Sequence, residues 1–306
     1  MNLCNIISKT LNLNTSIQII KLCSDQSSEA PLIYLVYSNS IPRYIIKKPK
    51  LNSIGVCKEK LLAEKNIISD ILSKNNSFKT LSFPQLKIYQ DSESFLIYQP
   101  FHKGKLLSSI KLNNQDINCI FNLLTDIHSI NSTNHPFDAL GLLEKKESIL
   151  KKHNIHIDKE IIHPLKKKIK ELSQKNPLTT SFSHGDFNPF NIIKHNKSYT
   201  LIDWEDAESK KHTLWDAFHF FTVYQRKNGR FNSTFFSEDP LNIQKKIIAL
   251  AQEWNIDLNW IMPLFYLYII DYAEIQSQEK RKKIKESQEW INFFINLYKK
   301  NIKIIK

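Results

Sequence analysis

Glycine is the residue that most limits what this chain can fold into, because only five glycines occur in 306 residues. The closest two, Gly104 and Gly141, stand 37 residues apart. Every loop that needs two neighbouring glycines is therefore excluded, which removes the Rossmann G-x-G-x-x-G loop, the Walker A loop and the G-x-S-x-G nucleophile elbow. A glycine-rich loop that covers phosphates is excluded for the same reason.

The cysteines and the apolar segments indicate the cellular setting. Cys4, Cys23, Cys57 and Cys119 form no C-x-x-C motif, so we expect neither a zinc ribbon nor a redox dithiol, and four cysteines make no disulfide framework in a chain of this length. The N-terminus lacks a charged start followed by a long apolar run, and the longest apolar run, 261–270, is too short to span a bilayer. We therefore expect a reduced, cytoplasmic protein without a transmembrane segment.

The secondary-structure pattern changes once along the chain. In the first hundred residues, a helical segment at 56–74 stands among β-rich runs at 31–37, 43–47, 84–89 and 94–98. From about residue 106 the pattern is helical, with one β segment at 178–205 and helices at 113–131, 143–152, 159–174, 214–227, 240–254, 257–278 and 284–300. The sequence predicts an α+β fold in two lobes, a small β-rich lobe at 1–101 and a larger helical lobe at 102–306.

The segment 181–205 contains the chemistry. Two β-rich runs flank the turn signal at 196–198, and Asn191 and Asp203 are equidistant from residue 197, so we expect them to be near partners across a hairpin. An amide oxygen and a carboxylate in that arrangement suit Mg²⁺. Asp186 lies on the loop that enters the hairpin and is placed to accept a hydroxyl proton. One such carboxylate beside an Asn/Asp metal pair is the arrangement used for phosphoryl transfer.

This segment resembles a known signature. His184-Gly185-Asp186 with Asn191 five residues later, followed by Ile-Asp203-Trp-Glu205, is similar to the motif of aminoglycoside phosphotransferases and choline kinase-like enzymes. The resemblance implies a protein kinase-like fold, ATP or alternatively GTP as phosphoryl donor, and Mg²⁺. A turn in which the aspartate of His-Gly-Asp caps a backbone amide is the plainer interpretation, but it explains only one of the two aspartates.

The resemblance further implies a strand lysine for the α- and β-phosphates and a helix glutamate that holds it. Lys47, near the end of the strand 43–48, aligns with that lysine, and Lys48 is the alternative. The helix 56–74 has an apolar stripe at positions 57, 61, 64, 68 and 71, and position 64 is Glu64. A carboxylate on a packed face needs a partner, and we expect Lys47. The alternatives are an exposed lysine and a glutamate at the edge of the stripe.

Other parts of the family pattern have weaker signals. The run 95–101 occupies the place of the strand and hinge that carry adenine, so main-chain groups near Gln99 and Phe101 are expected to contact the base. Residues 24–29 occupy the phosphate-covering position without a glycine. Asp216 matches a helix aspartate that accepts backbone amides of the catalytic loop. His184 is expected to support that loop rather than to act in catalysis.

Charge indicates possible partners. The net charge is +13, and the stretch 280–306 is strongly basic. Because this stretch also contains apolar residues at helical spacing, we interpret it as a terminal helix packed on the helical lobe and expect no nucleic-acid partner. Asp271 and Glu274 follow an apolar run, where Asp271 needs a partner, either a substrate ammonium or a basic residue of 280–285. Tyr266, Tyr268 and Tyr272 would either add contacts to a cation or pack in the core.

The resemblance implies an ATP/Mg²⁺-dependent phosphotransferase with a small-molecule hydroxyl acceptor, such as a sugar, an amino sugar or an amino alcohol like choline. Asp186 is the expected base, Lys47, oriented by Glu64, neutralises the α- and β-phosphates, and Asn191 and Asp203 hold the metal. A protein kinase-like enzyme is one alternative, although the chain has Asn188 where such enzymes place a lysine and lacks Asp-Phe-Gly and Ala-Pro-Glu. An inactive kinase-fold binding protein is the other alternative.

Overall fold

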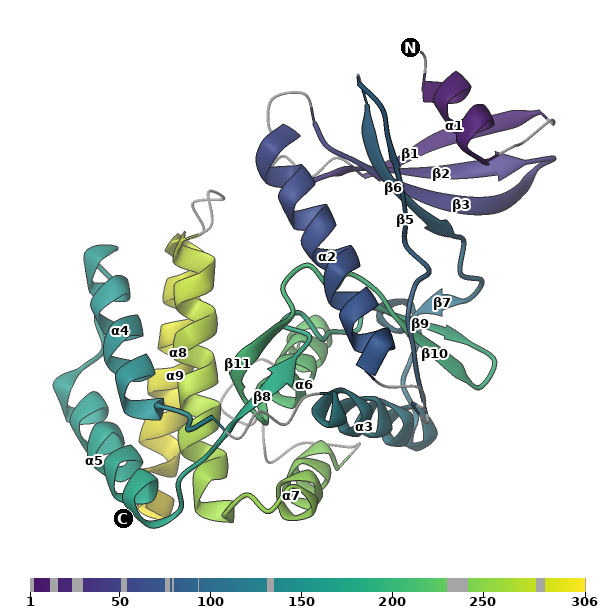
Figure 1. Cartoon of the computed structure of the whole chain (residues 1–306). Helices are drawn as coiled ribbons and strands as arrows, with labels where there is room; N and C mark the ends of the chain where they lie inside the picture. Colours follow the sequence, from purple (N-terminus) through teal and green to yellow (C-terminus); the bar gives the residue numbers. More distant parts are fainter. Residues whose placement is uncertain are drawn as a thin grey trace. The chain divides into compact units, whose positions relative to one another are not determined.

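The computed structural model describes residues 3–11, 16–23, 30–50, 54–74, 78, 80–92, 94–130, 135–229, 242–278 and 284–305. The chain forms two compact units. Unit 1 consists of Met1–Lys105 and Ile192–Asp206, and unit 2 consists of Leu106–Asn191 and Ala207–Lys306 (Figure 1). The hairpin that the sequence analysis placed in the second lobe is thus part of unit 1, although the stretches on both sides of it belong to unit 2.

Unit 1 is built on a five-stranded antiparallel sheet with the order β1-β2-β3-β6-β5. Its strands are β1 (Ile17–Cys23), β2 (Leu32–Ser38), β3 (Ile41–Lys48), β5 (Lys87–Gln90) and β6 (Phe95–Pro100). A tight turn joins β2 to β3, because Asn39 and Ser40 both have positive φ angles of 51° and 61°. Two consecutive left-handed residues match the twist of a hairpin. A register shift follows between Val36 and Tyr37, after which Lys47 pairs with Ile33.

Each face of this sheet is covered by one helix, because neighbouring strand residues point to opposite sides. On one face, α1 (Leu3–Leu11) packs its Ile6 and Ile7 in a cluster with Ile46 of β3 and Leu96 of β6. On the other, α2 (Ile54–Lys74) packs its Cys57 and Leu61 against Phe95 and Ile97 of β6. Lys47 follows Ile46, so it lies on the α2 face.

A smaller sheet with the order β4-β10-β9-β7 completes unit 1. It comprises β4 (Leu81–Ser82), β7 (Lys105–Leu106), β9 (Ile192–His195) and β10 (Ser198–Leu201). Ser198 pairs with His195 and Leu201 with Ile192, so the turn consists of residues 196 and 197, with Asn196 in the left-handed region (φ 56°). The prediction that Asn191 and Asp203 are cross-strand partners is therefore wrong by one residue, because the turn is one residue shorter than the turn assumed.

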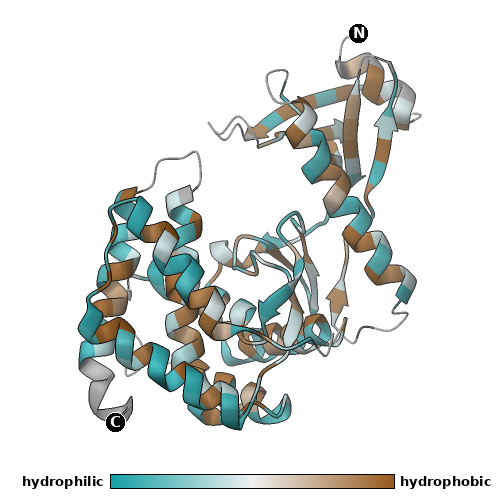
Figure 2. Cartoon of the chain, turned by 60° about the vertical axis from the view of Figure 1, so that its left-hand side comes forward, coloured by the Kyte–Doolittle hydropathy of each residue, from teal (hydrophilic) through white to brown (hydrophobic). Residues whose placement is uncertain are grey.

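Unit 2 is mainly helical, and its polar and apolar residues alternate along the helices (Figure 2). Its helices are α3 (Asn114–Ser129), α4 (Ala139–Lys152), α5 (Lys159–Lys175), α6 (Trp215–Lys227), α7 (Ile243–Glu253), α8 (Ile261–Gln278) and α9 (Ile284–Ile305), with short 3-10 helices at Leu107–Ser109 and Leu258–Trp260. A two-stranded sheet pairs β8 (Thr180–Ser183) with β11 (Glu208–His212).

The centre of unit 2 is α8, whose residues 264–270 are all fully buried. A helix that is apolar on every side must be surrounded by protein. The last helix, α9, packs against it: Phe294 meets Tyr266 at 5.3 Å and Trp290 meets Tyr272 at 4.7 Å between ring centroids. This confirms the prediction of a packed C-terminal helix. Among the described residues, the helices lack the combination of length and apolar character needed to cross a bilayer.

Candidate active site

The loop after β8 is held in shape by an aspartate at the start of α6. Asp216 is buried and accepts hydrogen bonds from Ser183 Oγ (2.9 Å), His184 N (2.8 Å) and Gly185 N (3.2 Å). Gly185 has a φ of +79°, a left-handed conformation that glycine adopts without a side-chain penalty. Burial raises the pKa of Asp216, although these donors oppose the rise. The predicted role of Asp216, accepting the backbone amides of this loop, is confirmed.

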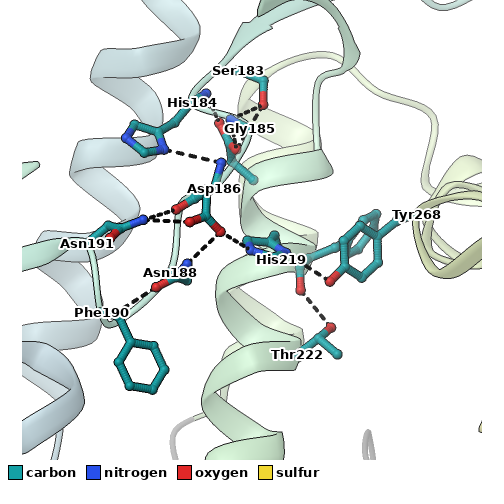
Figure 3. Close-up of polar contacts among 12 residues, drawn as sticks. Ser183, His184, Gly185, Asp186, Asn188, Phe190, Asn191, His219, Thr222 and Tyr268 are labelled. Carbon is teal, nitrogen blue, oxygen red and sulfur yellow. Dashed lines mark hydrogen bonds and ion pairs between the residues drawn. The ribbon is translucent and has the colours of Figure 1, made fainter. Parts of the chain in front are cut away.

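Asp186 is the carboxylate that this loop presents, and its side chain is 39% exposed (Figure 3). Asn188 Nδ2 donates to its Oδ1 at 2.6 Å, and Asn191 Nδ2 donates to its Oδ2 at 2.7 Å and to its carbonyl at 3.0 Å. His219 Nε2 lies 2.9 Å from Oδ1. Burial alone would raise the pKa of Asp186, but the hydrogen bond and charge of His219, with the smaller contributions of His184 and Asn188, hold it below its ordinary value.

His184 supports this loop, as the sequence predicted. Its side chain is buried, and its Nδ1 accepts a hydrogen bond from the backbone N of Asp186 at 3.3 Å. The imidazole thereby contributes to fixing the backbone of the residue that carries the carboxylate.

Sequence reasoning missed two residues of this site as partners of Asp186. The sequence singles out Asn188 only as a residue that replaces a lysine. In the structure its Nδ2 donates to the Asp186 carboxylate, and its Oδ1 accepts a hydrogen bond from the backbone N of Phe190 at 2.8 Å. His219 was not noticed at all. Its signal was its spacing, because residues three apart share a helix face and His219 follows Asp216 by three positions.

Unit 1 holds a second cluster of charges around Lys47. Its Nζ lies 2.8 and 3.0 Å from the two carboxylate oxygens of Glu64 and 2.8 Å from Oδ1 of Asp203. The ion pair predicted between Lys47 and the buried Glu64 is confirmed, which favours Lys47 over Lys48. Burial alone would lower the pKa of Lys47, but the charges of Asp203 and Glu64 outweigh burial and raise it.

A further carboxylate belongs to this cluster. Burial, and after it the negative charge of Asp203, raise the pKa of Glu205 to about 7, while Lys47 and Lys60 oppose the rise. Asp203 itself has a φ of 68°, uncommon for a residue other than glycine, so the chain turns there directly after β10. Such backbone strain is typical of functional positions.

The side chains of Asn191 and Asp203 fit a magnesium ion in their chemistry. The amide nitrogen of Asn191 is occupied by Asp186, which leaves its Oδ1 as the atom that would meet a ligand, and the Asp203 side chain is 40% exposed. Both offer the hard oxygen atoms that Mg²⁺ prefers. Within the described part of the chain, no group of three or more His, Cys, Asp or Glu residues is arranged to hold a metal. Each of these two residues would therefore need water or phosphate oxygens as further ligands of the ion.

Part of the main chain near the expected hinge at Gln99 and Phe101 is engaged with β3. Phe101 N donates to Arg43 O at 2.8 Å, and Gln99 is the register partner of Ile45. Because hydrogen-bonded and non-bonded pairs alternate in an antiparallel ladder, the polar groups of Gln99 and Phe101 turn toward β3. The carbonyl of Pro100, which lies between them, points away from β3 and toward the side of β5. The pairing of β5 with β6 ends at Lys87 and Tyr98, so β5 does not pair with Pro100. The predicted phosphate-covering loop, 24–29, lies outside the described residues.

The two acidic residues considered for a cationic acceptor have other partners. Asp271 lies 2.7 Å from Lys146 Nζ and 2.9 Å from Lys211 Nζ, and Glu274 lies 2.7 Å from Lys146 Nζ. Lys211 and Lys146 accordingly lower the pKa of Asp271, although burial opposes them. Among the described residues, Lys146 and Lys211 are thus partners of Asp271 that the sequence analysis did not name. The buried Tyr266 and Tyr268 pack in the core, as one of the two interpretations expected.

Comparisons with known proteins agree with this geometry. Residues 78–226 match the model of the phosphotransferase enzyme family (APH). A thermostable mutant of aminoglycoside phosphotransferase APH(4)-Ia in its apo form has a TM-score of 0.62 at 11% identity, covering 97% of this chain and 98% of that one. A GDP complex of a mutant aminoglycoside 2'-phosphotransferase-IIIa has a TM-score of 0.62 at 13% identity, covering 99% and 98%. No curated protein matches the chain.

The family match spans the Asp186 loop, Asn191, Asp203 and Asp216, and the similar structures extend over nearly the whole chain. Residues 78–226 are thus similar to the phosphotransferase enzyme family, and the chain has the kinase-like fold of the aminoglycoside phosphotransferases.

Proposed function

We propose that this protein transfers the γ-phosphoryl group of a nucleoside triphosphate to a hydroxyl of a small molecule, namely a sugar, an amino sugar or an amino alcohol such as choline. The observation that carries the proposal is the state of Asp186. Its carboxylate is partly exposed, fixed by three side-chain donors and held ionised by a lowered pKa. Such a group can orient an acceptor hydroxyl and take its proton as the oxygen attacks phosphorus.

Lys47 is the residue that we assign to the nucleotide phosphates. Glu64 is buried against it and keeps its ammonium group charged and fixed in position. Asn191 and Asp203 would hold Mg²⁺, which, when bound, neutralises charge on the phosphate oxygens. The contact between Lys47 and Asp203 supports this assignment, because it brings a phosphate-binding cation and a metal-binding carboxylate together in unit 1.

The base of the nucleotide is assigned to the end of β6. The Pro100 carbonyl faces away from β3, so it is the main-chain acceptor that an exocyclic amino group would meet. ATP offers such an amino group at C6 of adenine, whereas GTP presents an oxygen there. The position of this acceptor favours ATP, with GTP as the alternative; solved neighbours of similar fold have been obtained with ADP and with GDP.

The acceptor is proposed to carry few positive charges. A chain of net charge +13 repels polycations at long range. Asp271 and Glu274, the carboxylates nominated from the sequence for ammonium groups, are already paired with Lys146 and Lys211. Recruiting either one for a substrate would break a buried ion pair and leave a charge uncompensated, at a cost of about 3–5 kcal/mol.

A transfer screen tests the proposed function. The full chain is incubated with γ-labelled ATP or GTP, Mg²⁺ and single acceptors: choline, ethanolamine, glucosamine, glucose, kanamycin and, as a protein acceptor, casein. We expect label on a small acceptor, lost in Asp186→Ala and retained in Asp70→Ala, a matched control because Asp70 is an exposed aspartate of α2. Label on casein alone would indicate a protein kinase. Absence of any thermal shift with nucleotide and Mg²⁺ would indicate an inactive fold.

A further inference from the structure

His219 is the buried titratable residue that the proposed function has not used. It lies on α6, about one turn after Asp216, so both residues are on the same face of the helix and both contact the catalytic loop. Asp216 accepts hydrogen bonds from the backbone of His184 and Gly185. His219 instead contacts the side chain of Asp186 (Figure 3). The helix thus fixes both the course of the loop and the orientation of its carboxylate.

The surroundings of His219 allow little freedom to the imidazole. The residue is fully buried, and its ring stacks on Trp215 at 5.0 Å and 22° and lies against Tyr272 at 5.0 Å. The Tyr268 hydroxyl lies 3.2 Å from Nδ1. A carboxylate can only accept a hydrogen bond, so the hydrogen of the ring must be on Nε2, facing Asp186. The hydrogen bond between Nδ1 and the Tyr268 hydroxyl holds the other side of the ring.

The donors around Asp186 leave one of its oxygen atoms available. A carboxylate has about four lone-pair sites, two on each oxygen. Oδ1 accepts from Asn188 Nδ2 and from His219 Nε2, so both of its sites are used, whereas Oδ2 accepts only from Asn191 Nδ2. In the described part of the chain no other donor reaches this carboxylate. The remaining site is on Oδ2.

We propose that His219 is a positioning residue: it holds Oδ1 of Asp186, so that Oδ2 is the atom that takes the proton of the acceptor. This inference rests on the proposed function. In the step, the acceptor oxygen forms a bond to the γ-phosphorus of the nucleoside triphosphate, and the bond from that phosphorus to the β,γ-bridging oxygen breaks. The hydroxyl proton moves to Oδ2, and a nucleoside diphosphate leaves.

The role of His219 depends on its donor atom, and this separates it from a residue that merely fills space. The aromatic contacts with Trp215 and Tyr272 would hold any side chain of similar size, but only a donor at the Nε2 position can occupy Oδ1. Without this donor, Asp186 retains its hydrogen bonds from Asn188 and Asn191, but its carboxylate rotates more freely about the Cβ–Cγ bond. Both oxygens would then compete for the acceptor hydroxyl, and the productive orientation would be populated for a smaller part of the time.

The test compares two replacements of His219 in the full chain. His219→Gln retains an N–H near the Nε2 position, whereas His219→Leu has a similar volume and no donor. With γ-labelled ATP and the acceptor found by the screen above, we expect His219→Leu to lower kcat about 10- to 100-fold, the loss of one hydrogen bond to a charged group, with the KM for ATP nearly unchanged. His219→Gln should stay within a few-fold of the natural protein, and thermal unfolding shows whether each variant is folded.

A kcat for folded His219→Leu equal to that of the natural protein would overturn the inference. Equal losses in the Leu and Gln variants would overturn it too, because they would assign the effect to packing. If His219→Leu does not fold, the imidazole ¹⁵N signals of the natural protein decide: we expect His219 with its hydrogen on Nε2, and a hydrogen on Nδ1 alone would overturn the inference. A natural protein that labels none of the acceptors would overturn the proposed function itself, whatever the spectrum shows.

Discussion

His212 gives a prediction about acid stability whose size follows from the structure. It is the last residue of β11 and 2% exposed, and neither of its ring nitrogens has a hydrogen-bond partner among the residues that the structure describes. Its ring packs against Phe137 at 5.7 Å and Phe218 at 5.9 Å. Burial lowers its pKa from 6.5 to about 3; the charge of Asp271 opposes this shift, and the charge of Lys211 adds to it.

The sign follows from proton binding. Between pH 6.5 and about 3 the unfolded chain binds a proton at His212 that the folded chain does not bind, so acid favours unfolding. The contribution to stability is complete above pH 6.5 and declines as the pH falls toward 3. From pH 7.5 to 5.0 the loss is about 2 kcal/mol, since each pH unit below 6.5 contributes about 1.4 kcal/mol.

The perturbation is His212→Leu, which has a similar volume and meets apolar neighbours, so the folded state should tolerate it. The free energy of unfolding is measured in urea at pH 7.5 and 5.0 by tryptophan fluorescence, which reports mainly on unit 2 because Trp215, Trp254, Trp260 and Trp290 lie there. We expect the natural protein to lose about 2 kcal/mol more than the variant over this range.

Groups that titrate in both proteins cancel in this difference. The control is the replacement of His195 by Leu, because His195 is an exposed residue at the end of β9. It should leave the pH dependence of the natural protein unchanged. Equal pH dependence in the natural protein and in His212→Leu would show that His212 gains a proton without cost, which would refute the reasoning from its burial.

Four further outcomes follow from the site. Asp186→Ala should lower kcat at least about 100-fold and leave nucleotide affinity nearly intact, as equilibrium binding would show; full turnover would refute its role as base. Asp203→Asn should abolish the Mg²⁺ dependence of ATP binding in calorimetry, and unchanged dependence would contradict its role as ligand. Lys47→Ala, Glu64→Ala and the double variant should have similar kcat/KM, because the two residues act as one unit, whereas multiplied losses would separate them. Expression in a susceptible host should bring no large rise in tolerance to kanamycin-type drugs, and a rise abolished by Asp186→Ala would show that net charge was weighted too heavily.

The sequence predicted the parts of the fold whose periodicity is local. The helix of Glu64 was expected at 56–74 and spans Ile54–Lys74, because its apolar stripe leaves only one packed face. The helix Leu3–Leu11 and the strand Ile17–Cys23 were missed, since each becomes stable only by packing on a sheet formed by later residues.

The sequence predicted the charged residues of the candidate site, but it did not identify two hydrogen-bond partners of Asp186. Lys47 and Glu64 could be paired because a carboxylate on an apolar stripe demands a cation. Asn188 and His219 carry no such demand in the sequence, and only the folded chain brings them to Asp186. The hairpin register failed for a local reason, since a turn of two residues cannot be distinguished from one of three by residue type alone.

The order in which the chain is synthesised matters for unit 1. Its first stretch ends at Lys105, but β9 and β10 are contributed by Ile192–Asp206. These two strands pair with each other, and β10 also pairs with β4. A ribosome adds about 5–20 residues each second, so roughly ten seconds pass between the two stretches. During that time β4 lacks its partner strand β10, and Lys47 and Glu64 lack the third member of their charge cluster, Asp203. A fragment that stops near residue 105 should therefore expose the edge of an unfinished sheet to chaperones, proteases and other nascent chains.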